Sequence, residues 1–181
     1  MKEQLIKDYE ALHQIPEEGF NEYKTQKYIV NELKKLNCKI YELDSTGILA
    51  FFDYDTSETI AFRCELDGIN VEEETNLEYK SLHKGMMHAC GHDGHMAILL
   101  GLGRVLSNIK CPRNVCLIFQ PSEEKYGGAL KVIESSIYKQ LNIKEVYGLH
   151  LWPNLKSGVI ASRGKTLMSI LIKVLFEKVP E

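Results

Sequence analysis

The residues best suited to chemistry are concentrated in one short stretch, Met87–His95. Its nine residues include three histidines, one cysteine and one aspartate, with alanine and glycine between them. Cysteine thiolate and histidine nitrogen are the protein ligands that zinc and similar ions prefer. Gly91 gives the backbone the freedom to turn Cys90 and His92 toward one point. The stretch therefore predicts a transition-metal site with these two residues as ligands.

The other residues of this stretch have less certain roles. An isolated cysteine or histidine would be interpreted as a buried thiol, or as a core or helix-capping residue, and it is the density of donor groups that favours metal binding. Glycine disfavours a helix by about 1 kcal/mol relative to alanine, so we expect the next helix to begin near Gly94 and both ligands to lie on the loop before it. His95 and Asp93 are expected to orient the ligands, and for His88 both roles stay open.

A second set of candidates, Glu123 and Glu124, follows the apolar segment 115–119. Their ordinary interpretation is as acidic residues in the first turn of a helix that Ser122 caps. Their place directly after a predicted strand favours function, because α/β sheets bind ligands beyond the ends of their strands. Adjacent carboxylates can also divide the work, one binding a metal ion while the other acts as general base on water.

His150 lies in the apolar segment Val146–Trp152, where a lone histidine is usually a core residue. We interpret it as a further ligand only because the two earlier sites need partners. Cysteine, histidine and glutamate together make an unusual structural zinc site, which usually has paired cysteines, but they suit a catalytic centre. With a bridging ligand, such a set can hold two ions about 3.5–4 Å apart.

The elements that must position these groups follow from the hydrophobic pattern. We expect a long loop at 67–88, of the kind that usually carries function, and helices at residues 3–13, 22–36, 96–106 and 129–141. Predicted strands cover residues 39–43, 47–54, 58–64, 115–119, 145–151, 159–161 and 168–176. The second and third strands should form a hairpin, and the fourth and fifth should be buried. Helices alternating with short apolar strands predict a three-layer α/β domain.

The composition fits one globular domain and argues against several other classes of protein. The chain has 181 residues, of which 44% are hydrophobic, and a formal charge of −3 without the basic surface of a nucleic-acid-binding protein. No run approaches the roughly 18 apolar residues of a membrane span, and the N-terminal pattern is not that of a signal peptide. The five cysteines lack the paired spacing of a disulfide framework. We therefore expect a cytoplasmic protein with reduced thiols and neither nucleic-acid nor membrane partners.

Six blocks of sequence, taken together, point to a known family. They occur over nearly the whole chain, at Leu12–Phe20, Phe62–Gly68, Val71–Thr75, Met87–His95, Gln120–Glu124 and Gly148–Pro153. In content and order these blocks resemble the aminoacylase/carboxypeptidase-type metallopeptidases. The resemblance is to the amidohydrolase branch, which contains hippurate hydrolases, N-acetyl-diaminopimelate deacetylases and auxin-conjugate hydrolases.

The resemblance implies the three-layer αβα fold of a zinc-peptidase-like catalytic domain and a centre of two divalent metal ions. Zinc, manganese, cobalt and nickel all tolerate the ligand set. Carried over by motif, Cys90, His92, Glu124 and His150 would be metal ligands and Glu123 the general base. That base would take a proton from the attacking water and pass it to the leaving amine. The implied substrates are N-acyl amino acids of the N-acetyl or aroyl type.

The chain departs from the family's pattern in three ways. It has Arg63-Cys64-Glu65 where the family usually has Arg-Ala-Asp, and Asn70 where the family usually has proline. Family members are also about twice as long, with a lid and dimerisation domain and a further histidine ligand in the remaining part. We therefore expect residues 1–181 to be the N-terminal portion of an incomplete catalytic domain, inactive or weakly active by itself. Full-length relatives would be homo-oligomers, and this portion would self-associate through uncovered sheet edges.

Two other functions stay open from the sequence. In the first, the chain is a non-catalytic remnant that keeps partial binding of metal or of a partner. In the second, Cys90 is a nucleophile activated by His92 or His95. A chelator separates the second alternative from a metalloenzyme, because it abolishes only metal-dependent hydrolysis.

Overall fold

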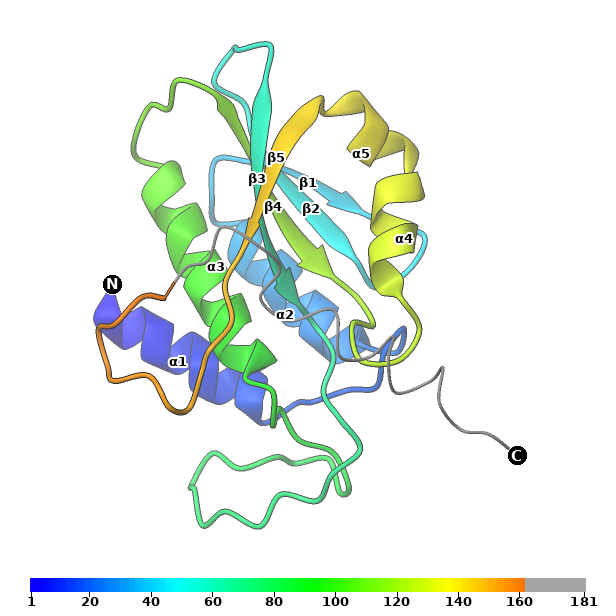
Figure 1. Cartoon of the computed structure of the whole chain (residues 1–181), viewed down its shortest axis with the longest axis vertical. Coiled ribbons are helices and arrows are strands. Elements are labelled where there is room, and N and C mark those ends of the chain that lie inside the picture. The colour runs from blue at the N-terminus through cyan, green and yellow to red at the C-terminus, as the bar shows by residue number, and fades with distance from the viewer. Residues whose placement is uncertain (162–181) are drawn as a thin grey trace. The chain divides into compact units, whose positions relative to one another are not determined.

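The centre of the fold is strand β4 (Asn114–Gln120), whose seven residues are all buried. Its run of Val, Cys, Leu, Ile and Phe gives it two apolar faces, as is typical of a strand covered on both sides. In the computed structural model, β4 pairs in parallel with β3 (Thr59–Glu65) and antiparallel with β2 (Ile48–Phe52). The edges are β1 (Lys39–Glu42) and β5 (Ile143–Gly148), which gives the order β1-β2-β4-β3-β5 (Figure 1).

β2 and β3 are strands, as predicted, but the predicted hairpin between them is wrong. β4 lies between the two strands and pairs with both. The polar turn at residues 55–57 therefore does not decide the pairing, because β4 can bury both of its edges only with a neighbour on each side. Since β3 and β4 are parallel, their carboxyl ends finish at the same end of the sheet.

One face of the sheet is covered by three helices, α1 (Lys2–His13), α2 (Tyr23–Leu33) and α3 (His92–Leu106). They share a large apolar core with alternate residues of the central strands, including Leu117 of β4. α1 and α2 confirm the two helices predicted near the N-terminus, and α3 contains the one predicted at 96–106.

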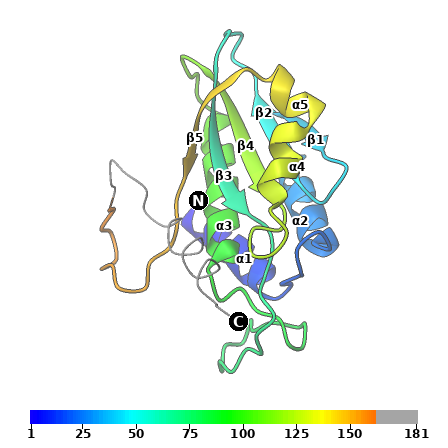
Figure 2. The ribbon, with the colours of Figure 1, turned by 45° about the vertical axis from the view of Figure 1, so that its right-hand side comes forward.

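The opposite face is covered by α4 (Gly128–Glu134) and α5 (Ser136–Gln140). A smaller core on this side includes Ile118, the neighbour of Leu117 in β4, as expected for strand side chains that alternate between two faces. Figure 2 shows the sheet between α3 and α4. The predicted three-layer α/β fold is confirmed.

Two elements near the end of this unit differ from the prediction. The single helix expected at 129–141 is broken at Ser135, whose backbone is extended and whose hydroxyl accepts the N–H of Tyr138 to start α5. The strand expected to be buried at 145–151 is β5, and five of its six residues are exposed. β5 is exposed because it is an edge strand, with its one pairing in the described sheet to β3.

The structure describes residues 1–161. Met1–Leu151 forms one compact unit, whose fold is given above, and a second unit begins at Trp152. Residues 152–161 form turns and irregular segments, so the strand predicted at 159–161 is wrong, while the one predicted at 168–176 lies outside the described residues. The predicted loop at 67–88 is present.

Among the described residues, no helix is both long enough and apolar enough to cross a bilayer.

Candidate metal centre

The predicted site residues lie where the parallel strands β3 and β4 finish. Asp67 follows β3, the segment with Glu123 and Glu124 follows β4, and His92 begins α3 beside them. This is the end of the sheet at which α/β folds bind ligands. Three segments far apart in the sequence therefore meet at one place.

Cys90, His92 and Glu124 are brought together there. One donor atom from each, a sulfur, a nitrogen and an oxygen, lies within 4.8 Å of the other two. His92 Nε2 is 3.8 Å from Glu124 Oε1. His92 is buried, Cys90 half-buried and Glu124 exposed, so the group is open to solvent on one side. This donor set and spacing fit a zinc-like ion, whose bonds to such atoms are about 2.0–2.3 Å long.

Gly91 allows this convergence, as the sequence suggested. Its φ of 83° lies in the left-handed region that favours glycine, and it is the N-cap of α3. The helix begins at His92, so the expectation that His92 lies on a loop before Gly94 is wrong. Gly94 lowers helix propensity, but a Cβ at this position would lie 2.8 Å from Leu151 Cδ1. Packing against Leu151 therefore explains a glycine inside the first turn.

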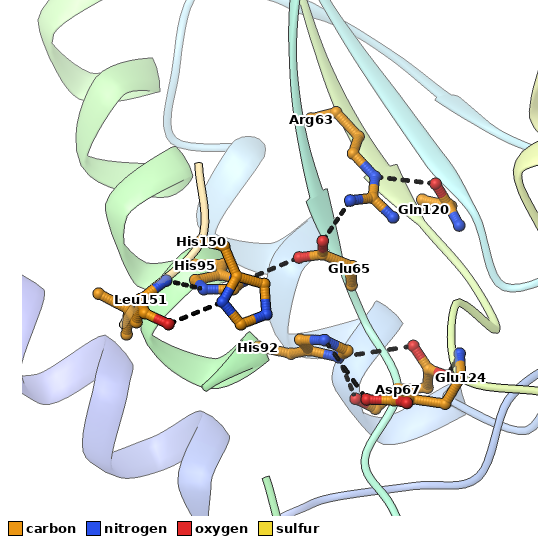
Figure 3. Close-up of polar contacts among 9 residues, drawn as sticks. All are labelled: Arg63, Glu65, Asp67, His92, His95, Gln120, Glu124, His150 and Leu151. Atoms are coloured by element: carbon orange, nitrogen blue, oxygen red, sulfur yellow. Dashed lines mark hydrogen bonds and ion pairs between the residues drawn. The ribbon is translucent and has the colours of Figure 1, made fainter. Parts of the chain in front are cut away.

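Asp67 orients His92, a role that sequence reasoning did not assign. His92 Nδ1 is 2.7 Å from the backbone oxygen of Asp67, which can only accept, so this nitrogen carries a proton (Figure 3). Nε2 is therefore the nitrogen left to bind a metal ion, and it is the one that faces Glu124. The Asp67 carboxylate also accepts the Glu124 N–H at 3.0 Å. One residue thus supports two of the three donors, as is usual for groups around metal ligands.

Without a metal ion, both Cys90 and His92 hold their protons strongly. Burial and the carboxylate of Glu124 raise the pKa of the Cys90 thiol to about 12. Burial alone would lower the pKa of His92, but the carboxylates of Asp67 and Glu65 raise it to about 9. Metal ligands must be deprotonated, so metal binding at this group would release protons. A thiol with so high a pKa is a poor nucleophile.

The turn that carries Glu123 and Glu124 is held by buried carboxylates. Glu22, the N-cap of α2, is fully buried and accepts the Ser122 N–H at 2.8 Å. Ser122 has a φ of 45°, a left-handed conformation uncommon for residues other than glycine. Glu22 therefore holds a conformation that the turn would not favour by itself. The Asp67 contact to Glu124 holds the other end of the same turn.

Two glycines close the space around this turn. A Cβ at Gly19 would lie 2.3 Å from Ser122 Oγ, and a Cβ at Gly128 would lie 1.8 Å from the Pro121 oxygen. Both distances are far shorter than a van der Waals contact, so neither position accepts a side chain. Sequence reasoning missed Glu22, Gly19 and Gly128. Glu22 and Gly19 act on a segment about 100 residues away, and the close approach of Gly128 to Pro121 depends on how the turn between them folds.

The alternative in which Ser122 caps a helix is wrong, because α4 begins only at Gly128. Glu123 and Glu124 therefore lie on a turn and do not serve to stabilise a helix. Burial and the adjacent charge of Glu124 raise the pKa of Glu123 above its usual range. A carboxylate with a raised pKa is better suited to accept a proton near neutral pH.

His150 is neither in a strand nor buried, which corrects the interpretation of its segment as a buried strand. It lies two residues beyond β5 and is exposed. Among the described residues, the donor group of Cys90, His92 and Glu124 does not include it. Its Nδ1 donates a hydrogen bond to the Leu151 oxygen at 2.7 Å, so the lone pair of Nε2 is the one that can bind a metal ion. The centre of its ring is 4.8 Å from that of His95.

A buried network lies beside the donor group and supports the start of α3. His95 Nδ1 is 2.8 Å from Glu65 Oε2, and Glu65 also contacts the guanidinium of Arg63 (Figure 3). Arg63 in turn donates to Gln120 Oε1 at 2.8 Å, which links the ends of β3 and β4. Glu65, His92 and His95 also form a second group whose donor atoms lie within 4.8 Å of one another.

The two remaining residues of the histidine-rich stretch have other surroundings. Among the described residues, the Asp93 carboxylate forms no hydrogen bond with a predicted ligand; it lies 2.6 Å from His13 Nδ1. Glu73 lies 3.1 Å from the other nitrogen of His13, so this ring bridges two carboxylates. Burial lowers the pKa of His88 to about 3, so it is neutral, and neither nitrogen has a hydrogen-bond partner among the described residues.

The chain is similar in sequence to a known peptidase family and to curated deacetylases. The sequence profile of peptidase family M20/M25/M40 matches residues 61–168. The N-acetyldiaminopimelate deacetylase of Oceanobacillus iheyensis is 40% identical over 170 residues, which are 92% of this chain and 45% of that protein. The enzyme of the same name from Streptococcus thermophilus is 39% identical over 176 residues, covering 94% of this chain and 47% of that protein.

A solved structure shares the fold as well as the sequence. The Bacillus subtilis YXEP protein, described as a dinuclear metal-binding peptidase of the M20 family, superposes with a TM-score of 0.79 and 33% identity. The match covers 84% of this chain and 44% of the Bacillus protein. The chain thus spans less than half the length of the proteins that it matches.

Proposed function

Because the chain belongs to peptidase family M20/M25/M40, we propose that it is the N-terminal portion of the catalytic domain of a metal-dependent amidohydrolase. Residues 1–181 would all belong to this portion. The observation that carries the proposal is the convergence of donor atoms of Cys90, His92 and Glu124 within 4.8 Å, with Glu123 directly before Glu124 in the sequence. Sulfur, nitrogen and oxygen donors of this kind suit a catalytic ion better than a structural one.

In this proposal, Cys90, His92, Glu124 and His150 hold two divalent ions of zinc, manganese, cobalt or nickel. The dinuclear description of the Bacillus protein supports the number of ions. The free Nε2 atoms of His92 and His150 support their assignment as ligands. When bound, such ions polarise a carbonyl and lower the pKa of water.

Glu123 is the proposed general base. It accepts a proton from water as the water oxygen bonds to the amide carbon, and it returns that proton to the nitrogen as the C–N bond breaks. The raised pKa of Glu123 suits both steps, because the group must accept a proton and then donate it near neutral pH. The turn held by Glu22 and Asp67 keeps this carboxylate in place.

The proposed substrates are N-acyl amino acids, which the reaction would divide into a carboxylate and a free amino acid. The names of the relatives from Oceanobacillus and Streptococcus support an acetylated amino acid in particular. Because this chain spans less than half of either relative, we propose that it turns over weakly by itself. The exposed edge strand β5 would also lead it to self-associate, which sedimentation at increasing concentration would reveal.

Two alternatives are less well supported. A cysteine nucleophile needs a lowered thiol pKa, whereas the pKa of Cys90 is raised to about 12. The other alternative is a non-catalytic remnant that retains partial binding of metal or of a partner. Such a remnant would not need an ordered group of metal ligands. His92, however, is buried and held by a hydrogen bond to the backbone of Asp67, which supports an ordered group.

Elemental analysis of the purified chain tests the proposal. The test variant combines Cys90→Ser with Glu124→Gln, and a matched control combines Cys111→Ser with Glu134→Gln, which makes the same changes outside the donor group. Two ions per chain, lost in the test variant and kept in the control, are expected. One ion would contradict the dinuclear part of the proposal, and no metal in any protein would favour the remnant.

A further inference from the structure

We infer that Glu65 and His95 are positioning residues that hold the backbone of Leu151, and through it His150, at the metal centre. The inference rests on the proposed function, because it concerns how a proposed ligand is placed. It adds two residues to which sequence reasoning gave either no role or no defined partner.

The hydrogen bonds of His95 determine its tautomer. Its Nε2 accepts the Leu151 N–H at 2.9 Å, and its Nδ1 is 2.8 Å from Glu65 Oε2 (Figure 3). A backbone N–H can only donate and an ionised carboxylate can only accept, so the proton lies on Nδ1. Arg63 contacts Glu65 and keeps it charged. By accepting the proton of His95 Nδ1 in a hydrogen bond, Glu65 leaves His95 Nε2 unprotonated, with its lone pair directed at the N–H of Leu151.

A second contact holds the same residue by its side chain. Leu151 Cδ1 lies where side chains at Gly91 and Gly94 would be, 3.2 Å and 2.8 Å from ideal Cβ positions. The two glycines thus form a notch at the start of α3 that receives Leu151. The start of α3 therefore holds Leu151 in two ways. His95 accepts a hydrogen bond from its backbone, and the notch makes an apolar contact with its side chain.

This attachment is needed because the sheet does not reach His150. β5 ends at Gly148, and the three residues from Leu149 to Leu151 have no strand pairing in the described structure. His150 donates from Nδ1 to the Leu151 oxygen, and its ring lies against that of His95. The position of the His150 ring therefore follows from the position of Leu151. Without His95 and the notch, an exposed ligand would have to be ordered by the metal ion alone.

The same cluster could instead be a metal site, since donor atoms of Glu65, His92 and His95 lie within 4.8 Å of one another. His95 argues against this, because one of its nitrogens faces a hydrogen-bond donor and the other faces the Glu65 carboxylate. A ligand needs a lone pair that no other group uses. The two interpretations predict different results for substitutions that leave His95 in place.

The test uses Gly94→Ala and His95→Phe. Gly94→Ala places a methyl group in the notch and displaces Leu151 without removing a nitrogen, and alanine is favourable in a helix. His95→Phe keeps a ring but removes both nitrogens, and His95→Gln returns an acceptor near the position of Nε2. The matched control is Gly101→Ala in the same helix, whose methyl would meet the tip of Leu5 instead.

Two measurements are made on each protein. Amide hydrogen exchange of Leu151, followed by NMR in the metal-free protein, reports the attachment. Binding of cobalt(II), followed by thiolate-to-cobalt absorption and by the dissociation constant, reports the centre. Leu151 should be protected in the wild type and in Gly101→Ala, and should exchange freely in Gly94→Ala and His95→Phe. These two variants should bind cobalt about tenfold more weakly with the thiolate band retained, and His95→Gln should restore part of both properties.

Unchanged protection of Leu151 in His95→Phe would overturn the inference, as would lost protection with unchanged cobalt affinity. Loss of one bound ion in His95→Phe with normal binding in Gly94→Ala would make His95 a ligand and also overturn it. If the wild type binds no cobalt, the proposed function fails instead. The exchange data then decide by themselves whether His95 holds Leu151.

Discussion

Strands β4 and β5 both lead to proposed site residues, yet the two strands are held very differently. β4 is buried along its whole length and leads into the turn that carries Glu123 and Glu124. Two buried carboxylates accept hydrogen bonds from the backbone of this turn. β5 is an exposed edge strand, and His150 beyond it is attached through Leu151. One side of the site therefore follows directly from a strand of the hydrophobic core, and the other depends on a few contacts at the start of α3.

Truncating an apolar side chain in each strand should give the largest difference. Leu117→Ala in β4 should lower the free energy of unfolding by about 2–5 kcal/mol, because Leu117 is fully buried and its loss leaves a cavity. Val146→Ala in β5 should change it by less than about 0.5 kcal/mol, because half of Val146 is exposed. Urea denaturation measures both values. Equal losses in the two strands would contradict the comparison.

Removing a carboxylate on each side should give a smaller contrast. Glu22→Ala leaves the buried N–H of Ser122 without its acceptor, which should cost about 1–3 kcal/mol and weaken metal binding by disordering the turn. Glu145→Ala in β5 removes an exposed ion pair with Arg113 and should change stability little. Denaturation and cobalt titration of both variants give the comparison. A Glu22→Ala protein with normal affinity for cobalt would show that the turn needs no such support.

The smallest expected effect is the dependence of stability on pH. Burial would lower the pKa of His13, but its hydrogen bonds to Asp93 and Glu73 raise it above the usual value. A histidine whose pKa is raised by folding stabilises the folded protein. This stabilisation is complete at pH values below the pKa of the unfolded state, about 6.5, and is lost as the pH rises through the pKa of the folded state. The stability of the wild type relative to His13→Gln should therefore decrease from pH 6.5 upward.

A constant difference in stability between the wild type and His13→Gln over this range would mean that His13 does not bridge its two carboxylates in the charged form.

Local patterns were enough to predict most helices and strands and to bring Cys90, His92 and the pair Glu123 and Glu124 forward as candidates. The choice of Glu124 as the ligand rested on the resemblance to the family. They failed where distant segments decide the structure. The hairpin between β2 and β3 was wrong because β4, some 50 residues later, separates the two strands. The start of α3 was misplaced because Gly94 is needed to receive Leu151.

The support of the site was the least predictable part. Asp67 contributes a backbone oxygen and Glu22 a carboxylate to residues 25 and 100 positions away. A sequence by itself shows that such residues are polar but not what they contact. For Glu65, the one available signal was its departure from the aspartate usual at this position. The exposure of His150 was missed because an apolar segment on an edge strand has the same composition as one in a core.

The two glycines that close the turn have a consequence for protein engineering. Any side chain at Gly19 or Gly128 would collide with Ser122 or Pro121 and move Glu123 with them. A library that varies this part of the chain should therefore keep both glycines, together with Asp67, which supports His92 and Glu124.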